Sequence, residues 1–210
     1  MTAVTLPSRK PRRRQTEIRE YRRQSLLHAA LITVGKYDIE AATVARICAQ
    51  AGASRGLIAH YFSSKEELLM SAIGGLFGEA QTLKEAIAKD ATLDPVERIR
   101  RIAHSSFKAP IYSWEAAAAW QAFTNASRHN NVYREPIRAS TQNSVNTVTP
   151  LFTLLAEQQR LRISVSEAAM GLFILIDGLW NSLATGKDAL QTSQAISFCN
   201  TFIEGCLRQE

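Results

Sequence analysis

Apolar residues along this chain recur at the spacing of one helix face. From Gln15 onward they return mostly every three to five positions, as in an amphipathic α-helix. No stretch shows the alternation typical of a half-buried strand, and no segment repeats at a fixed period. The pattern therefore predicts an all-α protein of about nine helices.

Polar caps, glycines and prolines mark the expected helix boundaries. Ser, Thr and Asp side chains accept hydrogen bonds from the first free N–H groups of a helix, whereas Gly and Pro end helices. The polar segment Asn130–Asn146 has no clear helical pattern. The expected caps are Thr43, Ser54, Ser64 (in a capping box with Glu67), Asp94 before Pro95, Ser113, and Ser164 or Ser166, and the expected stops are Gly35, Gly52, Pro110 and Gly186. The expected helices are 15–34, 43–51, 54–62, 64–89, 95–109, 113–123, 150–161, 168–183 and 193–207.

Composition narrows the class of protein. The chain has 210 residues, of which 46% are hydrophobic and 21% charged, as in ordinary globular domains. The longest apolar run, Ala168–Ile176, is much shorter than the roughly 20 residues of a membrane span. No apolar signal-peptide segment follows the basic N-terminus, and the three cysteines form no C-x-x-C pair. These features favour a soluble protein of the reducing cytoplasm, without a membrane partner.

The positive charge lies at one end of the chain. The formal net charge is +6, and residues 1–23 alone account for it, with eight arginines and lysines against two glutamates. Such an end suggests a polyanion, either nucleic acid or an anionic membrane surface. Within it, residues 1–14 form a basic flexible arm. Arg12–Arg14 of this arm either enter a DNA minor groove or belong to a solvated tail.

Residues 43–62 have the pattern of a helix-turn-helix. Two short helices flank a turn at Gly52, and glycine can adopt the positive φ that a tight turn needs. The small Cys48 lets the helices approach each other, and the apolar Ile58 packs at their crossing. Any αα-hairpin could carry these features, so this pattern alone leaves the alternative open.

Residues flanking the turn favour DNA as the partner. Ser54, Arg55 and Gly56 place a cap, a cation and a residue without Cβ at the start of the second helix, the end that meets base edges in the major groove. Arginine can donate two hydrogen bonds to guanine. Thr43 lies at the start of the first helix, where free N–H groups favour a phosphate. His60, Tyr61 and Lys65 follow downstream.

The stretch from Thr43 to Leu69 resembles the signature of the TetR family of transcriptional regulators. The resemblance rests on the spacing Gly52, Ser54-x-Gly56, Tyr61-Phe62, Lys65 and Leu68, with Cys48 standing where the family usually has alanine. It implies a homodimeric repressor with a DNA-binding domain over 15–68 and a ligand-binding and dimerisation domain over 69–210.

The same resemblance assigns roles by position. It implies that Thr43, Tyr61 and Lys65 contact phosphates, and that Arg55, Gly56 and His60 lie against base edges. The alternatives are a core ring for Tyr61, a surface side chain for His60 and a solvated cation for Lys65. The operator is then a pseudo-palindrome in double-stranded DNA.

The C-terminal half is similar to a branch of this family that represses choline-to-glycine-betaine genes. The similarity rests on Trp120-x-x-Phe123, Tyr133-Arg134 and Ile176–Trp180, although Thr124 stands where that branch often has a further aromatic residue. It implies a small-molecule effector, with choline or betaine aldehyde as candidates.

The residues themselves also suggest a cation site. Aromatic faces and a carboxylate hold a quaternary ammonium, which cannot donate hydrogen bonds. The alternatives are that Asp177 belongs to a structural network near the subunit interface and the rings to the core, or that the effector is uncharged and hydrophobic. The candidate ligand-binding residues are Trp114, Trp120, Phe123, Tyr133, Asp177 and Trp180.

Two C-terminal helices are expected to form the dimer, and one helix to connect the domains. The helices near 166–184 and 193–207 carry more apolar surface than one chain of this size needs to bury. The helix from Ser64 to Lys89 joins both domains, and Gly74, Gly75 and Gly78 within it suggest close packing or bending.

The sequence contains no catalytic, cofactor or metal pattern. Its histidines are scattered, and no nucleophile elbow or Glu-x-x-His pair occurs, so we expect neither an enzyme nor a cofactor. The competing hypothesis is a basic protein that binds DNA or a membrane surface without sequence preference, with a steep salt dependence.

Overall fold

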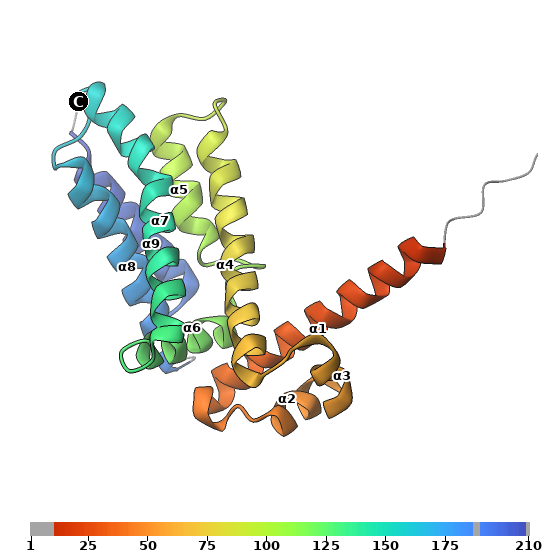
Figure 1. Cartoon of the computed structure of the whole chain (residues 1–210). Coiled ribbons are helices and arrows are strands. Elements are labelled where there is room, and N and C mark those ends of the chain that lie inside the picture. The colour runs from red at the N-terminus through yellow and green to blue at the C-terminus, as the bar shows by residue number, and fades with distance from the viewer. Residues whose placement is uncertain (1–10, 187–189, 209–210) are drawn as a thin grey trace, which may run out of the picture.

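The structure is a computed structural model that describes residues 11–186 and 190–208, with side chains from residue 15 onward. Within these residues the chain forms nine α-helices, as Figure 1 shows. The prediction of an all-α fold is confirmed. The helices are α1 (Pro11–Ala41), α2 (Val44–Ala51), α3 (Arg55–Tyr61), α4 (Lys65–Lys89), α5 (Pro95–Ser105), α6 (Trp114–Ala126), α7 (Asn131–Glu157), α8 (Val165–Thr185) and α9 (Thr192–Cys206).

Most helix starts follow the predicted caps. The side chains of Thr43, Ser54, Ser64, Asp94, Ser113 and Ser164 each accept a hydrogen bond from a backbone N–H in the first turn that follows. The capping box predicted at Ser64 is only half formed. Glu67 donates its N–H to Ser64 Oγ at 3.0 Å, but its carboxylate accepts from the backbone and hydroxyl of Ser63.

The first helix is longer than predicted at both ends. It begins at Pro11, so residues 11–14 of the expected flexible arm are helical, and the rest of that arm lies outside the described residues. It also passes Gly35, the predicted stop, and reaches Ala41 with a break at Asp38 (φ 68°). Gly35 serves close packing instead. A Cβ there would lie 2.6 Å from the carbonyl oxygen of Glu115 in α6.

The polar segment without a clear pattern is helical. Helix α7 runs from Asn131 to Glu157 and includes both Pro136 and Pro150, the second of which was the predicted helix start. Packing against α4, α5 and α8 outweighs the two missing N–H donors. The prediction that Pro110 ends the preceding helix was also inaccurate, because α5 already ends at Ser105.

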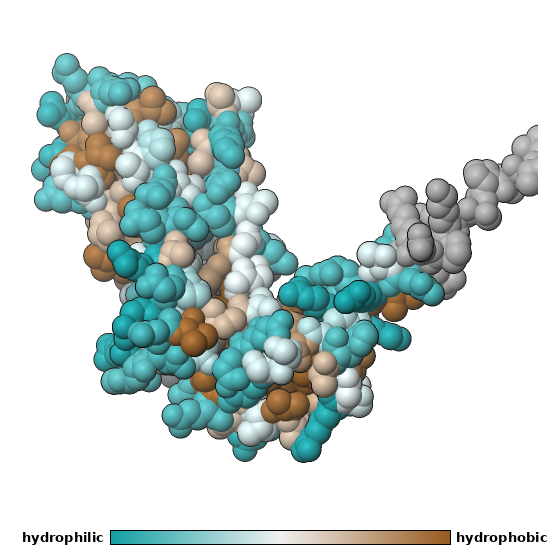
Figure 2. Space-filling view, viewed as in Figure 1, coloured by the Kyte–Doolittle hydropathy of each residue, from teal (hydrophilic) through white to brown (hydrophobic). Residues whose placement is uncertain are grey.

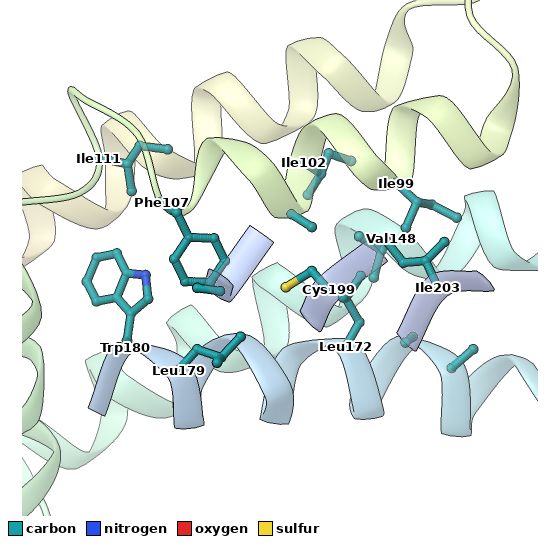
Figure 3. Packing of buried hydrophobic residues seen from close by; sticks show 14 of the residues in the cluster. Ile99, Ile102, Phe107, Ile111, Val148, Leu172, Leu179, Trp180, Cys199 and Ile203 are labelled. Atoms are coloured by element: carbon teal, nitrogen blue, oxygen red, sulfur yellow. The ribbon is translucent and has the colours of Figure 1, made fainter. Parts of the chain in front are cut away.

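The helices form two connected groups. Helices α1–α3 and the first half of α4 share one cluster of buried side chains, and α4–α9 form an upright bundle around a second, part of which Figure 3 shows. Helix α4 enters both clusters, with Leu69 and Ile73 in the first and Ala80 in the second. Helix α6 does the same, because Phe123 lies in the first cluster and Trp120 in the second.

The N-terminal part of α1 projects away from both groups. Figure 2 shows mainly hydrophilic residues on this projecting part. Although the helical spacing of apolar residues begins near Gln15, Ile18 and Tyr21 on this part are exposed, Tyr21 by 76%. The buried stripe begins only at Leu26, where α1 reaches the body of the molecule.

Helix α8 packs one face into the bundle, and its length and composition alone would allow it to cross a membrane. No continuous apolar run of that length was found in the sequence, because Asp177 interrupts it. Leu172, Leu179, Trp180 and Leu183 of α8 are buried in the bundle. Packing inside the protein therefore explains the apolar character of one face of this helix, while Met170 and Ile174 are exposed.

Candidate functional site

Helices α2 and α3 form the predicted helix-turn-helix. Gly52 ends α2 in the left-handed region (φ 61°, ψ 33°), a conformation that costs glycine least. Cys48 on α2 and Ile58 on α3 are both buried at the crossing. The turn then extends to Ser54, whose hydroxyl accepts from the N–H of Leu57 at 3.2 Å and starts α3.

The outer face of α3 carries the predicted base-reading residues. Arg55, Gly56 and His60 are exposed, and no neighbouring side chain holds the Arg55 guanidinium within the described part of the chain. Tyr61 is half-buried, with its ring edge-on to that of His60 at 5.1 Å between centroids. The structure thus brings a free arginine and a histidine to one exposed helix face, next to a tyrosine anchored in the fold.

Thr43 and Lys65 lie at the starts of α2 and α4. Thr43 is exposed, and its hydroxyl accepts from Arg46 N–H at 3.3 Å. Lys65 Nζ donates to the carbonyl oxygen of Ile39 at 3.0 Å and so ties α4 to the irregular end of α1. An ammonium has three donors, so this bond leaves capacity for a phosphate.

Arg46 is an exposed cation near Thr43 that the sequence reasoning did not single out. It donates to the carbonyl oxygen of Ala41 at 2.8 Å and lies over the ring of Tyr37, 4.6 Å from its centroid. No recognisable motif marks this position, because its neighbours come from the preceding helix.

A cavity of about 330 Å³ lies in the C-terminal bundle, a volume at the lower end of ordinary ligand sites. Its walls come from α4 to α8, and four aromatic side chains line it: Phe77, Trp120, Phe173 and Trp180. Trp120 and Trp180 were predicted ligand residues. Phe77 and Phe173 were not, since each looks like an ordinary core residue of its helix.

Asp177 lines the same cavity and is bonded to Trp120. Trp120 Nε1 donates to Asp177 Oδ1 at 2.6 Å, and Asn181 Nδ2 lies 3.4 Å from Oδ2. The indole N–H of Trp180 donates to the carbonyl oxygen of Ser106 at 2.8 Å. Both indole donors are therefore occupied, and the two tryptophans offer a ligand ring surface rather than N–H groups. No lysine or arginine forms an ion pair with Asp177 among the described residues.

The other three predicted ligand residues do not line the cavity. Phe123 and Tyr133 are buried in the N-terminal cluster, edge-on to each other at 5.4 Å between centroids. Trp114 is the first residue of α6 and lies about one and two-thirds turns before Trp120, so it is on a different side of the helix and does not line the cavity. The family resemblance and the chemistry of aromatic rings suggested these residues, but the structure does not place them in the wall that contains Asp177.

Lys84 is the cavity residue that the sequence reasoning missed. It lines the cavity from α4, and burial lowers the pKa of its ammonium from 10.5 to about 8. In the described residues no ion pair or hydrogen bond involves it. In sequence it stands among polar residues and resembles a solvated face. The available signal was its spacing of seven from Phe77, which puts both on one helix face.

None of these residues forms a metal site. Throughout the described residues, no group of three His, Cys, Asp or Glu side chains is placed to hold a metal ion. The cavity offers aromatic rings, one carboxylate, one ammonium and neutral polar groups, a set that suits a small polar organic molecule.

Two family models match the chain. Residues 26–72 match the model described as bacterial regulatory proteins, tetR family, and residues 95–208 match the model described as BetI-type transcriptional repressor, C-terminal. The first match contains the helix-turn-helix, and the second contains most of the cavity wall.

Relatives with known names agree with these models. A protein named HTH-type transcriptional regulator BetI from Stenotrophomonas maltophilia (strain R551-3) is 34% identical over 182 residues, which cover 84% of this chain and 89% of that protein. A protein of the same name from Burkholderia mallei (strain NCTC 10229) is 30% identical over 193 residues, covering 90% and 95%. These relatives are transcriptional regulators and not enzymes.

Solved structures share the fold. A transcriptional regulator from Saccharomonospora viridis, described as a complex with choline, matches with a TM-score of 0.78 and 22% identity, covering 90% of this chain and 99% of that chain. A regulator from Pseudomonas aeruginosa PAO1 matches with a TM-score of 0.74 and 24% identity, covering 89% and 90%. At these identities the likeness concerns the fold alone.

Proposed function

Because the chain belongs to the TetR family and is a BetI-type transcriptional repressor, we propose that it binds an operator as a homodimer and is released by a small organic cation. Choline and betaine aldehyde are the candidate effectors. Such a regulator acts on DNA in the cytoplasm.

The observation that carries the effector assignment is the bonded pair of Trp120 and Asp177. A carboxylate without a cationic partner lies at the wall of a cavity lined by four aromatic rings. Each ring that meets a quaternary ammonium contributes about 0.5–2 kcal/mol, and a carboxylate adds its charge. The structural neighbour from Saccharomonospora viridis, described in complex with choline, supports the same class of ligand.

The DNA-binding assignment rests on α2 and α3, within a DNA-binding domain over 15–68. We assign Arg55, Gly56 and His60 to base edges, because these residues are exposed on one face of α3. Ser54 shapes the start of that helix. Thr43, Tyr61 and Lys65 are assigned to phosphates on either side.

The dimer assignment rests on α8 and α9, in the ligand-binding and dimerisation domain over 69–210. Ile174 and Met170 on α8 and Phe198 on α9 are exposed, Ile174 by 60%. A second copy of the chain would cover these side chains. A two-fold dimer would then present two α3 helices about 34–36 Å apart, one for each operator half-site.

Helix α6 is well placed to couple the two sites. Trp120 reaches the cavity, whereas Phe123 one turn later packs in the N-terminal cluster, and Glu115 lies against Gly35 of α1. A ligand that binds more tightly when α6 is in one position than when it is in another would shift the DNA-binding domain. Helix α4, the predicted connection, runs between the same two groups.

Binding to DNA upstream of the protein's own gene tests the proposal. Fluorescence anisotropy at physiological salt should give a saturable complex at least about 10³-fold tighter than random DNA, and choline should weaken it. The Asp177→Asn variant should bind the operator as before but respond to choline at least about tenfold less.

Different outcomes separate the parts of the proposal. Specific binding that choline leaves unchanged, together with release by an uncharged hydrophobic compound, would overturn the cation assignment. A protein that sediments as a monomer at micromolar concentration would contradict the dimer. Binding to all DNA alike, with a steep salt slope, would favour the non-specific alternative.

A further inference from the structure

The cavity has two poles of opposite charge. Of the ionisable side chains among its described lining residues, Asp177 is the anion and Lys84 the cation. Neither forms an ion pair with any described residue. A ligand that carries only a positive charge would satisfy the first group and leave the second unmatched.

The poles are separated along α4. The rings of Phe77 and Trp120 meet edge-on at 4.9 Å between centroids, so Phe77 marks the level of the Trp120–Asp177 pair. Lys84 follows Phe77 by two helical turns, a rise of about 10 Å. Both residues line the same cavity, and the flexible lysine side chain can extend toward a ligand from that distance.

The groups near Lys84 leave its charge uncompensated. Gln81, one turn earlier, is held by Glu85 at 2.7 Å and Thr147 at 2.9 Å. Glu85 itself lies outside the wall of this cavity and pairs with Lys89 at 3.6 Å. The neutral side chains of Ser140, Asn143 and Ser144 on α7 complete this part of the wall and can add hydrogen bonds to an anion.

We propose that the cavity that takes a cation such as choline binds a zwitterion more tightly, with a quaternary ammonium at Trp120 and Asp177 and an anionic group, carboxylate or phosphate, at Lys84. The proposal rests on the cation site of the proposed function and adds the second pole. A partly desolvated ammonium is costly unless an anion pairs with it. Its pKa of about 8 keeps Lys84 mostly protonated at pH 7 and ready for that anion.

Calorimetry with the full-length protein at pH 7 tests the second pole. The probes are choline and two trimethylammonium carboxylates, glycine betaine with one methylene and γ-butyrobetaine with three methylenes between the charges. We expect one of the zwitterions to bind at least about tenfold more tightly than choline, because it pairs with both poles. Lys84→Met should abolish that preference and leave choline binding unchanged or tighter.

Two controls keep the outcomes distinct. Lys89→Met removes an exposed lysine of the same helix and should leave the preference intact. The neutral choline analogue 3,3-dimethylbutan-1-ol should bind weakly if the cation site exists.

Choline binding more tightly than both zwitterions, or a preference that survives Lys84→Met, overturns the second pole alone. Equal binding of choline and its neutral analogue overturns the proposed cation site itself. Lys84→Gln serves if the methionine variant fails to fold.

Discussion

The DNA-binding face and the cavity are assembled in different ways. The candidate DNA contacts all come from residues 43–65. Each helix in this segment starts at a residue whose side chain accepts a hydrogen bond from the backbone N–H three positions later. The cavity takes its walls from five helices between Gly74 and Trp180. The first region therefore depends on local backbone geometry, whereas the second depends on how distant helices pack together.

The two regions also differ in how they treat charge. Arg55 and His60 are exposed to solvent, where a charge costs little. Lys84 and Asp177 are partly buried in the bundle, so each is a cost to folding unless something pairs with it. Changes at the DNA face should affect binding and spare stability, while changes in the cavity should alter both.

The largest expected effect is a gain in stability from Lys84→Met. The depression of the Lys84 pKa from 10.5 to about 8 corresponds to a penalty of at most about 3 kcal/mol in the free energy of unfolding. An apolar side chain of similar length removes that penalty. Urea denaturation at pH 7 should show the variant to be more stable than the wild type.

The pH dependence of this gain has a definite sign. Below about pH 8 the lysine is charged in both states, so the penalty is constant. Between pH 8 and 10.5 only the unfolded chain keeps the proton, so the stability of the wild type rises toward that of the variant. Lys89→Met, in the exposed part of α4, should change stability by no more than about 0.5 kcal/mol. A gain for Lys84→Met that is the same at pH 7 and pH 11 would contradict this account.

A change at the junction of the two regions should be destabilising. In Gly35→Ala the new Cβ would lie 2.6 Å from the carbonyl oxygen of Glu115, which is backbone and cannot rotate away. Helices α1 and α6 must then separate, at a cost of about 1–3 kcal/mol. Thermal unfolding measures the loss. A variant as stable as the wild type would show that this contact is not tight in solution.

Substitutions on the DNA-binding face should change DNA affinity and leave stability unchanged. Arg55→Ala should weaken operator binding by about 1–3 kcal/mol, the discrimination expected for one bidentate contact to guanine, with no change in melting temperature. Arg162→Ala is the matched control, because Arg162 is an exposed arginine far along the chain from α3. Anisotropy with the operator and with random DNA separates the effects. Equal losses on both DNAs would make Arg55 a phosphate contact.

The sequence was more informative about the DNA-binding face than about the cavity, for a physical reason. A cap such as Thr43 or a turn such as Gly52 acts over a few residues, so spacing along the chain is enough to predict it. Trp120 and Asp177 could be suggested by their chemistry. Their 2.6 Å hydrogen bond, however, joins two residues that are 57 positions apart in the sequence. Lys84 was missed, because its enclosure depends on the packing of α4 against α5 and α7, which its neighbours in sequence do not reveal.

The same limit applies to several helix boundaries. Gly35 is a common helix-stop residue, yet the close approach of α6 requires a residue without Cβ inside the helix. The two prolines of α7 argue locally against a continuous helix, and only contacts with α4, α5 and α8 explain it. These are the positions at which tertiary packing overrides local preference.

The smallest expected effects come from one substitution made at two glycines. Gly52 has φ 61°, so Gly52→Ala forces a side chain into the left-handed region and should cost about 1 kcal/mol. Gly75 lies inside α4, and a Cβ added there would meet no neighbouring group within 4 Å, so Gly75→Ala should stabilise the helix by about 0.5–1 kcal/mol.

The expectation that Gly74, Gly75 and Gly78 permit close packing is not supported, since a Cβ at any of them would meet open space. Their remaining role is bending. Gly75→Ala should raise the melting temperature in either case. If α4 must bend to release DNA, this substitution will also raise the choline concentration needed for release. A raised melting temperature with unchanged release would leave α6 as the connection between the two regions.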